Sequence, residues 1–345
     1  MRAGCGGYDV WSPGYLDTTM KAFRARTITI ATLLLLLTAL AGLGTLVLRG
    51  THDTGRDAGS GRPDGDAQSV DLARDIADYT SRFTPDGGYL PPSRTERRLV
   101  TDGVALLLDG HREQAEQRLA EVDFGIRTLA DSATGRRFAE VYDRVDQAPH
   151  PRGWGRVYVD LDHRARWSVQ VPHPVADHGT EQLGVRVLRG TPGGVLIVAG
   201  AHRKSGEGDA SDVAHRRDTV FHAVCAELVR RGFPGVQLHG FADDSAPDHD
   251  VVASTGKGSE GRADGRRLAD ALRDRGFAVC RAWVRSCPLE GHENVQGRTA
   301  ADEDVPFLHV EFARSVRSSD ARAAEAAAAV RVVTSRWDAA SGVRR

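Results

Sequence analysis

Imidazole and carboxylate side chains gather in this sequence just after a short apolar strand pattern. The strand pattern covers 167–171, and a turn-rich stretch then carries His173, Asp177, His178 and Glu181. Imidazole and carboxylate groups are the ligands that zinc prefers in catalytic sites. Such a site uses three protein ligands and one open position for water, so the test is whether later strand patterns end in similar groups.

Two later strand patterns carry groups of the same kind. His239 ends the apolar run 236–238, and Glu311 lies inside the apolar run 307–312. Ligands of an open α/β sheet bind outside the carboxyl ends of its strands, where such residues meet. We therefore expect His239 to join the first cluster and Glu311 to lie close by.

The candidate metal ligands are two histidines and one carboxylate. We predict that they are His173, Asp177 and His239, with Glu181 and His202 as alternates. His202 qualifies because it also follows an apolar strand pattern, although a histidine in this position is often a solvated loop residue. The predicted cofactor is Zn²⁺.

Glu311 is the candidate general base. A carboxylate between apolar strand residues needs either a partner or a function. Near a bound zinc it could take a proton from water and pass it to a leaving amine. The structural alternative is an ion pair with Arg314.

Three arginines are candidates for binding a substrate carboxylate, because a guanidinium group can donate two parallel hydrogen bonds to it. Arg314 is the preferred candidate, since it follows the strand that carries Glu311, and Arg216 and Arg203 are alternates.

Strand and helix patterns alternate after residue 151 and predict an α/β domain over 151–340, with a mainly parallel or mixed sheet and flanking helices. Strands are expected at 156–161, 167–171, 194–199, 235–238, 251–253, 278–283 and 307–312, and helices at 214–231, 261–275 and 320–337. Before this domain, apolar residues recur at three and four positions over 70–83, 94–108 and 112–129. We therefore predict a small helical region over 70–150.

The N-terminal part is predicted to direct export, either as a membrane anchor or as a signal peptide. Residues 27–48 carry no charge over 22 positions, which is enough to cross a hydrocarbon core of about 30 Å as a helix. Basic residues precede this run, so residues 1–26 are expected in the cytoplasm and the rest outside, after a flexible linker at 49–69. The predicted location is the cell membrane, with a single pass. A secreted product is the alternative, with Met20 as the start and cleavage after Ala39-Leu-Ala41.

The net charge argues against nucleic acid as a partner, and the cysteines allow one disulfide. The formal net charge is −1, which gives no basic field for nucleic acid. Cys280 and Cys287 are seven positions apart, and an exported protein can oxidise them to a disulfide. Two free thiols are the alternative.

Four short motifs resemble those of a known group, the zinc-dependent N-formylglutamate amidohydrolases and phage poly-γ-glutamate hydrolases, which are relatives of the zinc carboxypeptidases. The motifs are Val-Pro-His173 with Asp177, Gly-Thr-Glu181, Leu-His239-Gly and His-Val-Glu311-Phe-Ala-Arg314. The resemblance covers roughly residues 169–317. It implies that His173, Asp177 or Glu181, and His239 hold zinc and that Glu311 is the base.

The sequence thus predicts an exported, membrane-anchored zinc hydrolase that cleaves an amide or peptide bond next to a carboxylate. Its expected substrates are cell-wall peptides or γ-glutamyl amides, and its N-terminal helix contacts the membrane. The alternative is an exported α/β binding module that has lost the metal. It is motivated by proline after His173 and by Gln237, where the amidohydrolases carry Ser-Gly and Asp.

The export signal predicts the side of the membrane on which the domain lies. A reporter fused after Thr51 should be active only outside the membrane, because the basic residues before position 27 hold the N-terminus inside. Activity of a cytoplasm-specific reporter at this position would contradict both the anchored and the secreted interpretation.

Overall fold

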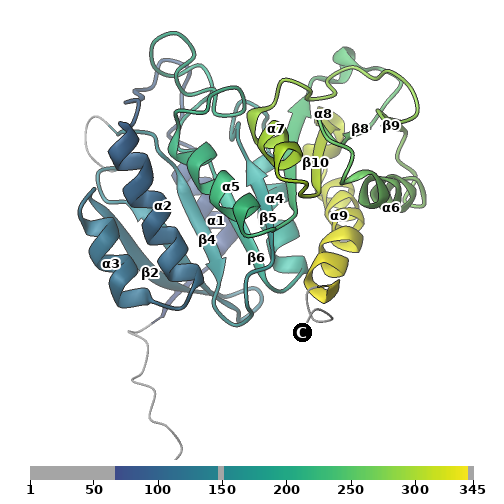
Figure 1. Cartoon of the computed structure of the whole chain (residues 1–345). Coiled ribbons are helices and arrows are strands. Elements are labelled where there is room, and N and C mark those ends of the chain that lie inside the picture. The colour runs from purple at the N-terminus through teal and green to yellow at the C-terminus, as the bar shows by residue number, and fades with distance from the viewer. Residues whose placement is uncertain (1–66, 147–150, 341–345) are drawn as a thin grey trace, which may run out of the picture. The chain divides into compact units, whose positions relative to one another are not determined.

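A mixed sheet runs through the part of the chain that the computed structural model describes, residues 67–146 and 151–340 (Figure 1). Its ten strands have the order β1-β2-β3-β4-β6-β5-β7-β10-β8-β9. Their bounds are β1 Gln68–Val70, β2 Phe124–Asp131, β3 Arg137–Asp143, β4 Arg156–Asp160, β5 Trp167–Val171, β6 Gly194–Val198, β7 Gly235–Phe241, β8 Val251–Ser254, β9 Val279–Arg281 and β10 Phe307–Ala313. The central strands β6, β5, β7 and β10 are parallel. Their carboxyl ends define one edge, here called the carboxyl edge.

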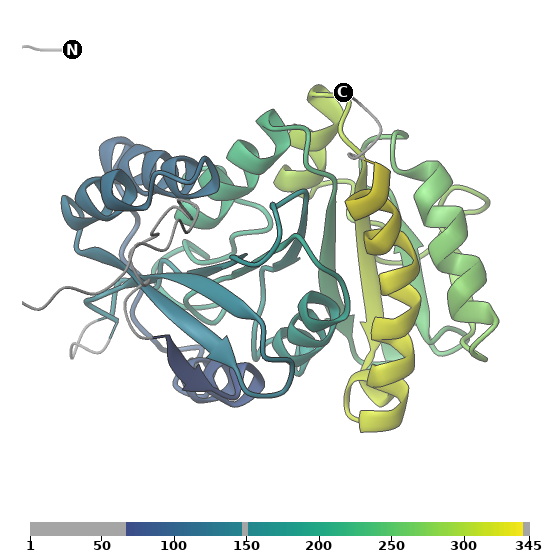
Figure 2. The ribbon, with the colours of Figure 1, turned by 90° about the horizontal axis from the view of Figure 1, so that it is seen from below.

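Helices cover both faces of this sheet (Figure 2). One face packs against α1 (Leu72–Thr80), α4 (Thr180–Gly190), α6 (Arg262–Arg273) and α9 (Asp320–Ala340). The other face packs against α2 (Arg94–Leu108), α3 (Arg112–Ala120), α5 (Val220–Arg230) and α7 (Val295–Asp302), and the short α8 (Arg314–Arg317) follows β10. Strands buried on both faces read as continuous apolar runs. The Gly-Val-Leu-Ile-Val run of β6 has this character, and all five of its residues are buried.

The α/β class is confirmed, and the sheet is mixed because β2, β3, β4 and β6 pair antiparallel to one another while β8 pairs antiparallel to β10. The predicted membrane segment 27–48 and nearly all of the predicted linker lie outside the described residues. Within the described ranges, no helix has the length and apolar character needed to cross a bilayer.

The prediction of a purely helical region over 70–150 is wrong in its second half. Helices form at 72–80, 94–108 and 112–120, but β2 and β3 follow, and β3 pairs with β4 of the predicted α/β domain. The error has a physical cause. Leu119, Val122, Ile126 and Leu129 are spaced like a helix face, whereas Asp123 adopts a positive φ of 58° that ends the helical segment before β2 begins.

A close approach of backbone segments lies where the chain enters β4. Gly155 has a φ of +95°, and a Cβ at this position would lie 2.4 Å from the carbonyl oxygen of Val198, the last residue of β6. A side chain would therefore combine backbone strain with a clash against a rigid strand. Only glycine allows the segment before β4 to pass so close to β6.

Replacement of Gly155 by alanine should lower the free energy of unfolding by about 2–4 kcal/mol, since strain and steric overlap add. Urea unfolding followed by circular dichroism measures this loss. Gly135→Ala is the matched control, because Gly135 also has a positive φ of 73° but no atom within 4 Å of the added Cβ. An equal loss in both variants would show that the contact with Val198 contributes nothing.

Candidate metal centre

Two histidines and one aspartate from the carboxyl edge come together as the sequence predicts. His173 and Asp177 lie in the turns between β5 and α4, and His239 is the fifth residue of β7. One ligand atom from each lies within 4.8 Å of the others, and all three residues are buried. Residues that are 66 positions apart in the sequence thus form one cluster, because β5 and β7 are parallel neighbours.

One oxygen of Asp177 is the centre of this cluster. Its Oδ2 lies 3.2 Å from His173 Nδ1 and 3.3 Å from His239 Nδ1, and it accepts a hydrogen bond of 3.2 Å from the backbone N–H of Gly240. The two imidazole rings meet edge to face, with centroids 5.0 Å apart. Both Nδ1 atoms therefore face the same carboxylate oxygen.

The opposite nitrogen of each ring contacts a hydrogen-bond acceptor. His173 Nε2 lies 2.8 Å from Asp212 Oδ1, and His239 Nε2 lies 2.7 Å from Gln237 Oε1. The Gln237 amide is oriented by its own network, since its Nε2 donates to the carbonyl oxygens of Gln170 and Gln296. With a proton on Nε2, each ring in its neutral form directs the lone pair of Nδ1 toward Asp177.

Three electron-pair donors consequently converge on one point, which is the arrangement that a metal ion needs. Two neutral Nδ1 atoms and a carboxylate oxygen repel one another unless a cation or a proton lies between them. The residues present therefore fit a metal ion, held by His173, Asp177 and His239. Hydrogen bonding of each ligand histidine to a second acceptor is the usual way in which proteins orient such rings.

The pKa values of the three residues in this cluster are shifted in the protein without a bound metal ion. Burial disfavours the charged form of His173, but its contacts with Asp177 and Asp212 outweigh burial and raise its pKa. Burial lowers the pKa of His239 to about 4, so this ring stays neutral. Burial alone would raise the pKa of Asp177, yet contacts with both histidines hold it well below its usual value. A proton on His173 and a metal ion are therefore alternatives at the same place.

Glu311 lines a cavity next to the three candidate ligands, in the position predicted for a base. A cavity of about 470 Å³ is bordered by His173, His239, Glu311 and the loop 286–294. Glu311 is 7% exposed, and its Oε1 lies 3.9 Å from His309 Nε2. Burial, followed by the charge of Asp177, raises its pKa well above the ordinary value. A cation in the cluster would act in the opposite direction.

His309 is a site residue that sequence reasoning missed. Its ring stacks on His239 with centroids 4.4 Å apart, and it lines the cavity beside Glu311. The other side of the ring packs on Gly291, where a Cβ would come within 2.4 Å of it. The strand pattern around Leu308 and Val310 makes this histidine look like a core residue.

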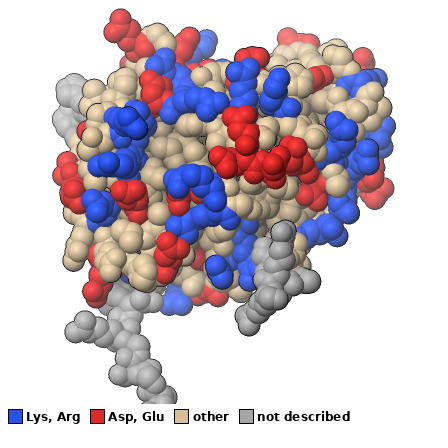
Figure 3. Space-filling view, viewed as in Figure 1, with Lys and Arg blue, Asp and Glu red and all other residues tan. Residues whose placement is uncertain are grey.

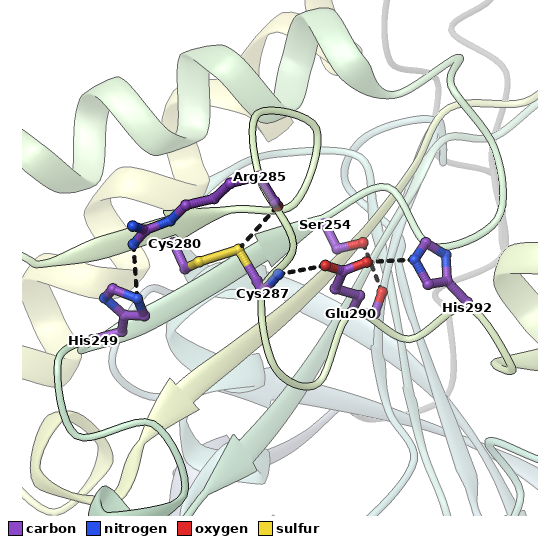
Figure 4. The surroundings of a disulfide bond; sticks show 7 residues. All are labelled: His249, Ser254, Cys280, Arg285, Cys287, Glu290 and His292. Atoms are coloured by element: carbon purple, nitrogen blue, oxygen red, sulfur yellow. Dashed lines mark hydrogen bonds and ion pairs between the residues drawn. A yellow bond between two sulfur atoms is a disulfide. The ribbon is translucent and has the colours of Figure 1, made fainter.

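The predicted disulfide between Cys280 and Cys287 is present (Figure 4). Cys287 also lines the cavity next to the cluster. The disulfide joins β9 to the loop 286–294. Within this loop, Glu290 accepts a hydrogen bond from the backbone N–H of Cys287 and contacts His292. Cys225, by contrast, is free and buried in α5.

The two alternate ligands lie outside the cluster. Glu181 is the second residue of α4, and its carboxylate accepts a long hydrogen bond of 3.5 Å from the backbone N–H of Val175. His202 is partly buried, and its Nδ1 accepts a hydrogen bond of 3.2 Å from the backbone N–H of Lys204. Among the described residues, neither belongs to a group that could hold a metal ion.

Of the three predicted arginines, Arg203 lines the cavity. One of its terminal nitrogens donates to Asp212 Oδ2 over 2.6 Å, and the other lies 3.4 Å from His173 Nδ1. Asp212 thus holds both a ligand histidine and this guanidinium group. It lies 39 positions from His173 in the sequence, so no local pattern indicates its role.

The other two arginines lie elsewhere. Arg216 forms two hydrogen bonds of 3.0 and 2.8 Å with Asp218. Arg314 is the exposed first residue of α8 and does not line the cavity, because β10 ends at Ala313 and the chain turns into a helix. Their contact with substrate stays a prediction. The alternative pairing of Arg314 with Glu311 is absent from the ion pairs of the described residues.

Comparisons with known proteins give solved structures but no sequence relatives. The chain matches no protein-family model and no curated protein. N-formylglutamate amidohydrolase from Ralstonia eutropha JMP134 superimposes at a TM-score of 0.39 and 14% identity, over 54% of this chain and 98% of that one. A bacteriophage poly-γ-glutamate hydrolase gives a TM-score of 0.39 and 14% identity, over 57% and 96%.

A putative carboxypeptidase A from Shewanella denitrificans OS-217 gives a TM-score of 0.38 and 12% identity, over 67% of this chain and 69% of that one. These proteins are of the kinds that the sequence motifs resemble. TM-scores below 0.5 do not carry a functional argument, which therefore rests on the geometry of the centre.

Removal of the acceptor behind His173 should weaken metal binding without removing a ligand. Asp212→Ala is expected to lower zinc affinity about 10–100-fold, because His173 loses the hydrogen bond that orients it. Competition with a zinc-chelating dye measures the change. Asp218→Ala is the matched control, since that aspartate pairs with Arg216 away from the cavity. Equal affinity in both variants would contradict the assigned role of Asp212.

Proposed function

We propose that this protein is an exported, membrane-anchored, zinc-dependent hydrolase of an amide or peptide bond. One observation carries the proposal. The acceptor atoms of His173, Asp177 and His239 converge on one point next to a cavity that also exposes the Glu311 carboxylate. Metal ligands beside a carboxylate without a hydrogen-bonded partner are the parts that hydrolysis of an amide requires.

The proposed mechanism divides the work among these residues. Zinc, when bound, would polarise the substrate carbonyl and make water more acidic. Glu311 would accept a proton from the attacking water and then donate it to the leaving amine nitrogen. Asp212 and Gln237 would hold the two imidazole rings in the required tautomer. The packing of His309 between His239 and Gly291 would keep the wall beside Glu311 rigid.

Arg203 is the residue that we propose to bind a substrate carboxylate. Its guanidinium group lines the cavity next to His173, and Asp212 fixes one of its nitrogens. A carboxylate adjacent to the scissile amide could accept hydrogen bonds from the remaining N–H groups. Outside a bacterial membrane, cell-wall peptides and γ-glutamyl polymers carry such carboxylates, and we propose one of these as the substrate.

The second candidate function is an exported binding module without metal. Gln237 in place of a carboxylate behind His239 is the observation that favours it, since an amide makes a ligand histidine less basic than a carboxylate does. Metal analysis of the purified protein separates the two functions. About one zinc per chain supports the hydrolase, and a folded chain that binds no zinc supports the module.

Replacement of Glu311 by glutamine should separate catalysis from metal binding. The variant should keep its zinc and lose hydrolysis of a γ-glutamyl amide by a factor of about 10² or more, because glutamine cannot take up the proton. His173→Ala and His239→Ala should lose zinc and activity together. Metal analysis and a rate assay on the same samples test this, and loss of zinc in the glutamine variant would make Glu311 a ligand.

A further inference from the structure

A second polar cavity lies between α1 and the strands β2, β3 and β4, away from the metal ligands. Its volume is about 520 Å³, within the range of small-molecule sites. Four arginines and four aspartates line it, together with Tyr79 and Tyr142. The charges of its wall therefore balance, which disfavours a ligand that is purely anionic or purely cationic.

Arg156 is the central residue of this cavity. It is only 7% exposed, its guanidinium carbon lies 3.7 Å above the centre of the Tyr79 ring, and one terminal nitrogen donates to Glu140 over 2.7 Å. Its Nε makes no hydrogen bond, with Asp146 Oδ2 3.9 Å away, and one of its terminal nitrogens lies 3.7 Å from Asp75 Oδ2. A buried guanidinium N–H without an acceptor is costly, so a ligand group that accepts from it would be stabilising.

Further unsatisfied polar atoms gather around Arg156. Nine buried side-chain atoms of the described residues make no hydrogen bond, and four of them belong to residues that line this cavity. Asp75 Oδ2 and Asp146 Oδ2 are acceptors, Arg156 Nε is a donor, and the Tyr79 hydroxyl can do either. Native proteins rarely leave such atoms unsatisfied in one place, so water or the polar groups of a ligand are expected to hydrogen-bond to them.

The raised pKa of Asp146 supports the binding of a cationic group beside it. Burial, and then the charge of Asp143, raises the pKa of Asp146 to about 7 despite the nearby Arg156 and Arg82. The arginines of the wall thus do not compensate this carboxylate fully. An ammonium group next to Asp146 and Asp75 would do so, and a carboxylate would match Arg156.

We propose that this cavity binds the zwitterionic centre of an α-amino acid, with its ammonium group on Asp75 and Asp146 and its carboxylate on Arg156. The Tyr79 hydroxyl, which faces Asp146 without reaching hydrogen-bond geometry, becomes a third contact. Tyr79 is 3% exposed and lines the cavity. We call this the zwitterion site.

The zwitterion site lies on the same edge of the sheet as the metal centre. Arg156 pairs with Val198 of β6, which pairs with Val171 of β5, two residues before His173. Two strand spacings of about 4.8 Å separate these rows. A smaller cavity of about 290 Å³ shares Tyr79, Arg82 and Asp146 with the site and reaches His202. The bound amino acid is therefore either free or the zwitterionic end of a γ-glutamyl chain.

Calorimetry on the full-length, metal-free protein tests the site independently of any hydrolytic activity. L-glutamine should bind, whereas N-acetyl-L-glutamine, without the ammonium group, and L-glutaminamide, without the carboxylate, should each bind at least about tenfold more weakly. Retention of binding in His173→Ala separates this site from the metal centre. Absence of glutamine binding at millimolar concentration, or equal binding of all three compounds, would overturn the proposal.

Variants of residues in and near the cavity test whether glutamine binds there. Tyr79→Phe should fold normally, because its hydroxyl makes no hydrogen bond, yet bind glutamine at least about tenfold more weakly. Tyr158→Phe is the matched control, since it removes an equally unsatisfied hydroxyl near Arg156 that does not line the cavity, and its affinity should be unchanged. Asp146→Asn should weaken binding in the same way as Tyr79→Phe. Equal affinity in the Tyr79 variant and the wild type would show that glutamine binds elsewhere.

The affinity for a further compound distinguishes the two sources of the ligand, a free amino acid and the end of a γ-glutamyl chain. Tighter binding of γ-L-glutamyl-L-glutamate than of glutamine, by about tenfold, assigns the site to the end of a γ-glutamyl chain. Equal binding assigns it to free amino acids.

Discussion

The Asp177 carboxylate is the contact on which the rest of the centre depends. Its Oδ2 faces one nitrogen of His173 and one of His239, and the N–H of Gly240 fixes it from the side of β7. Three acceptors in one place are unfavourable without a positive charge. The fold therefore has to hold them together from outside, which it does through Asp212 behind one ring and Gln237 behind the other.

This arrangement requires buried polar groups in the middle of the sheet. Gln237 lies in β7 between apolar residues and forms hydrogen bonds with Gln170 of β5 and Gln296 of α7. A fully bonded amide network of this kind fixes orientations that apolar packing would leave free. Arg317 adds a second restraint. It donates to the backbone carbonyls of Phe312, His178 and Phe241 and so joins the ends of β10 and β7 to the turn that carries Asp177.

Part of the site could be predicted because polar residues follow or interrupt apolar strand patterns. His173 and Asp177 come after β5, His239 follows Leu238 in β7, and Glu311 interrupts the apolar residues of β10. His173, Asp177, His239 and Glu311 could be named for this reason. Asp212 could not be given its role, since it supports His173 from a segment without regular pattern, 39 positions away. The role of His309 could not be predicted because the apolar strand pattern around it is typical of a core residue. The position of Arg314 could not be predicted because it depends on where β10 ends. Local spacing does not encode such tertiary contacts.

The second half of the helix predicted over 112–129 is instead part of β2, and this changes how the domain is understood. Its helix-like spacing predicted a separate helical region, but β2 and β3 extend the sheet and bring Arg127, Glu140 and Arg156 together beneath α1. Figure 3 shows that acidic and basic side chains are also interspersed on one face of the surface, so no field of a single sign dominates that face. The proposed recognition of a charged ligand would then depend on local groups of arginine and aspartate. The strands that lengthen the sheet provide such a group on the edge that carries the candidate metal ligands, and their pairing with β4 joins residues 121–143 to the same sheet instead of a separate helical region.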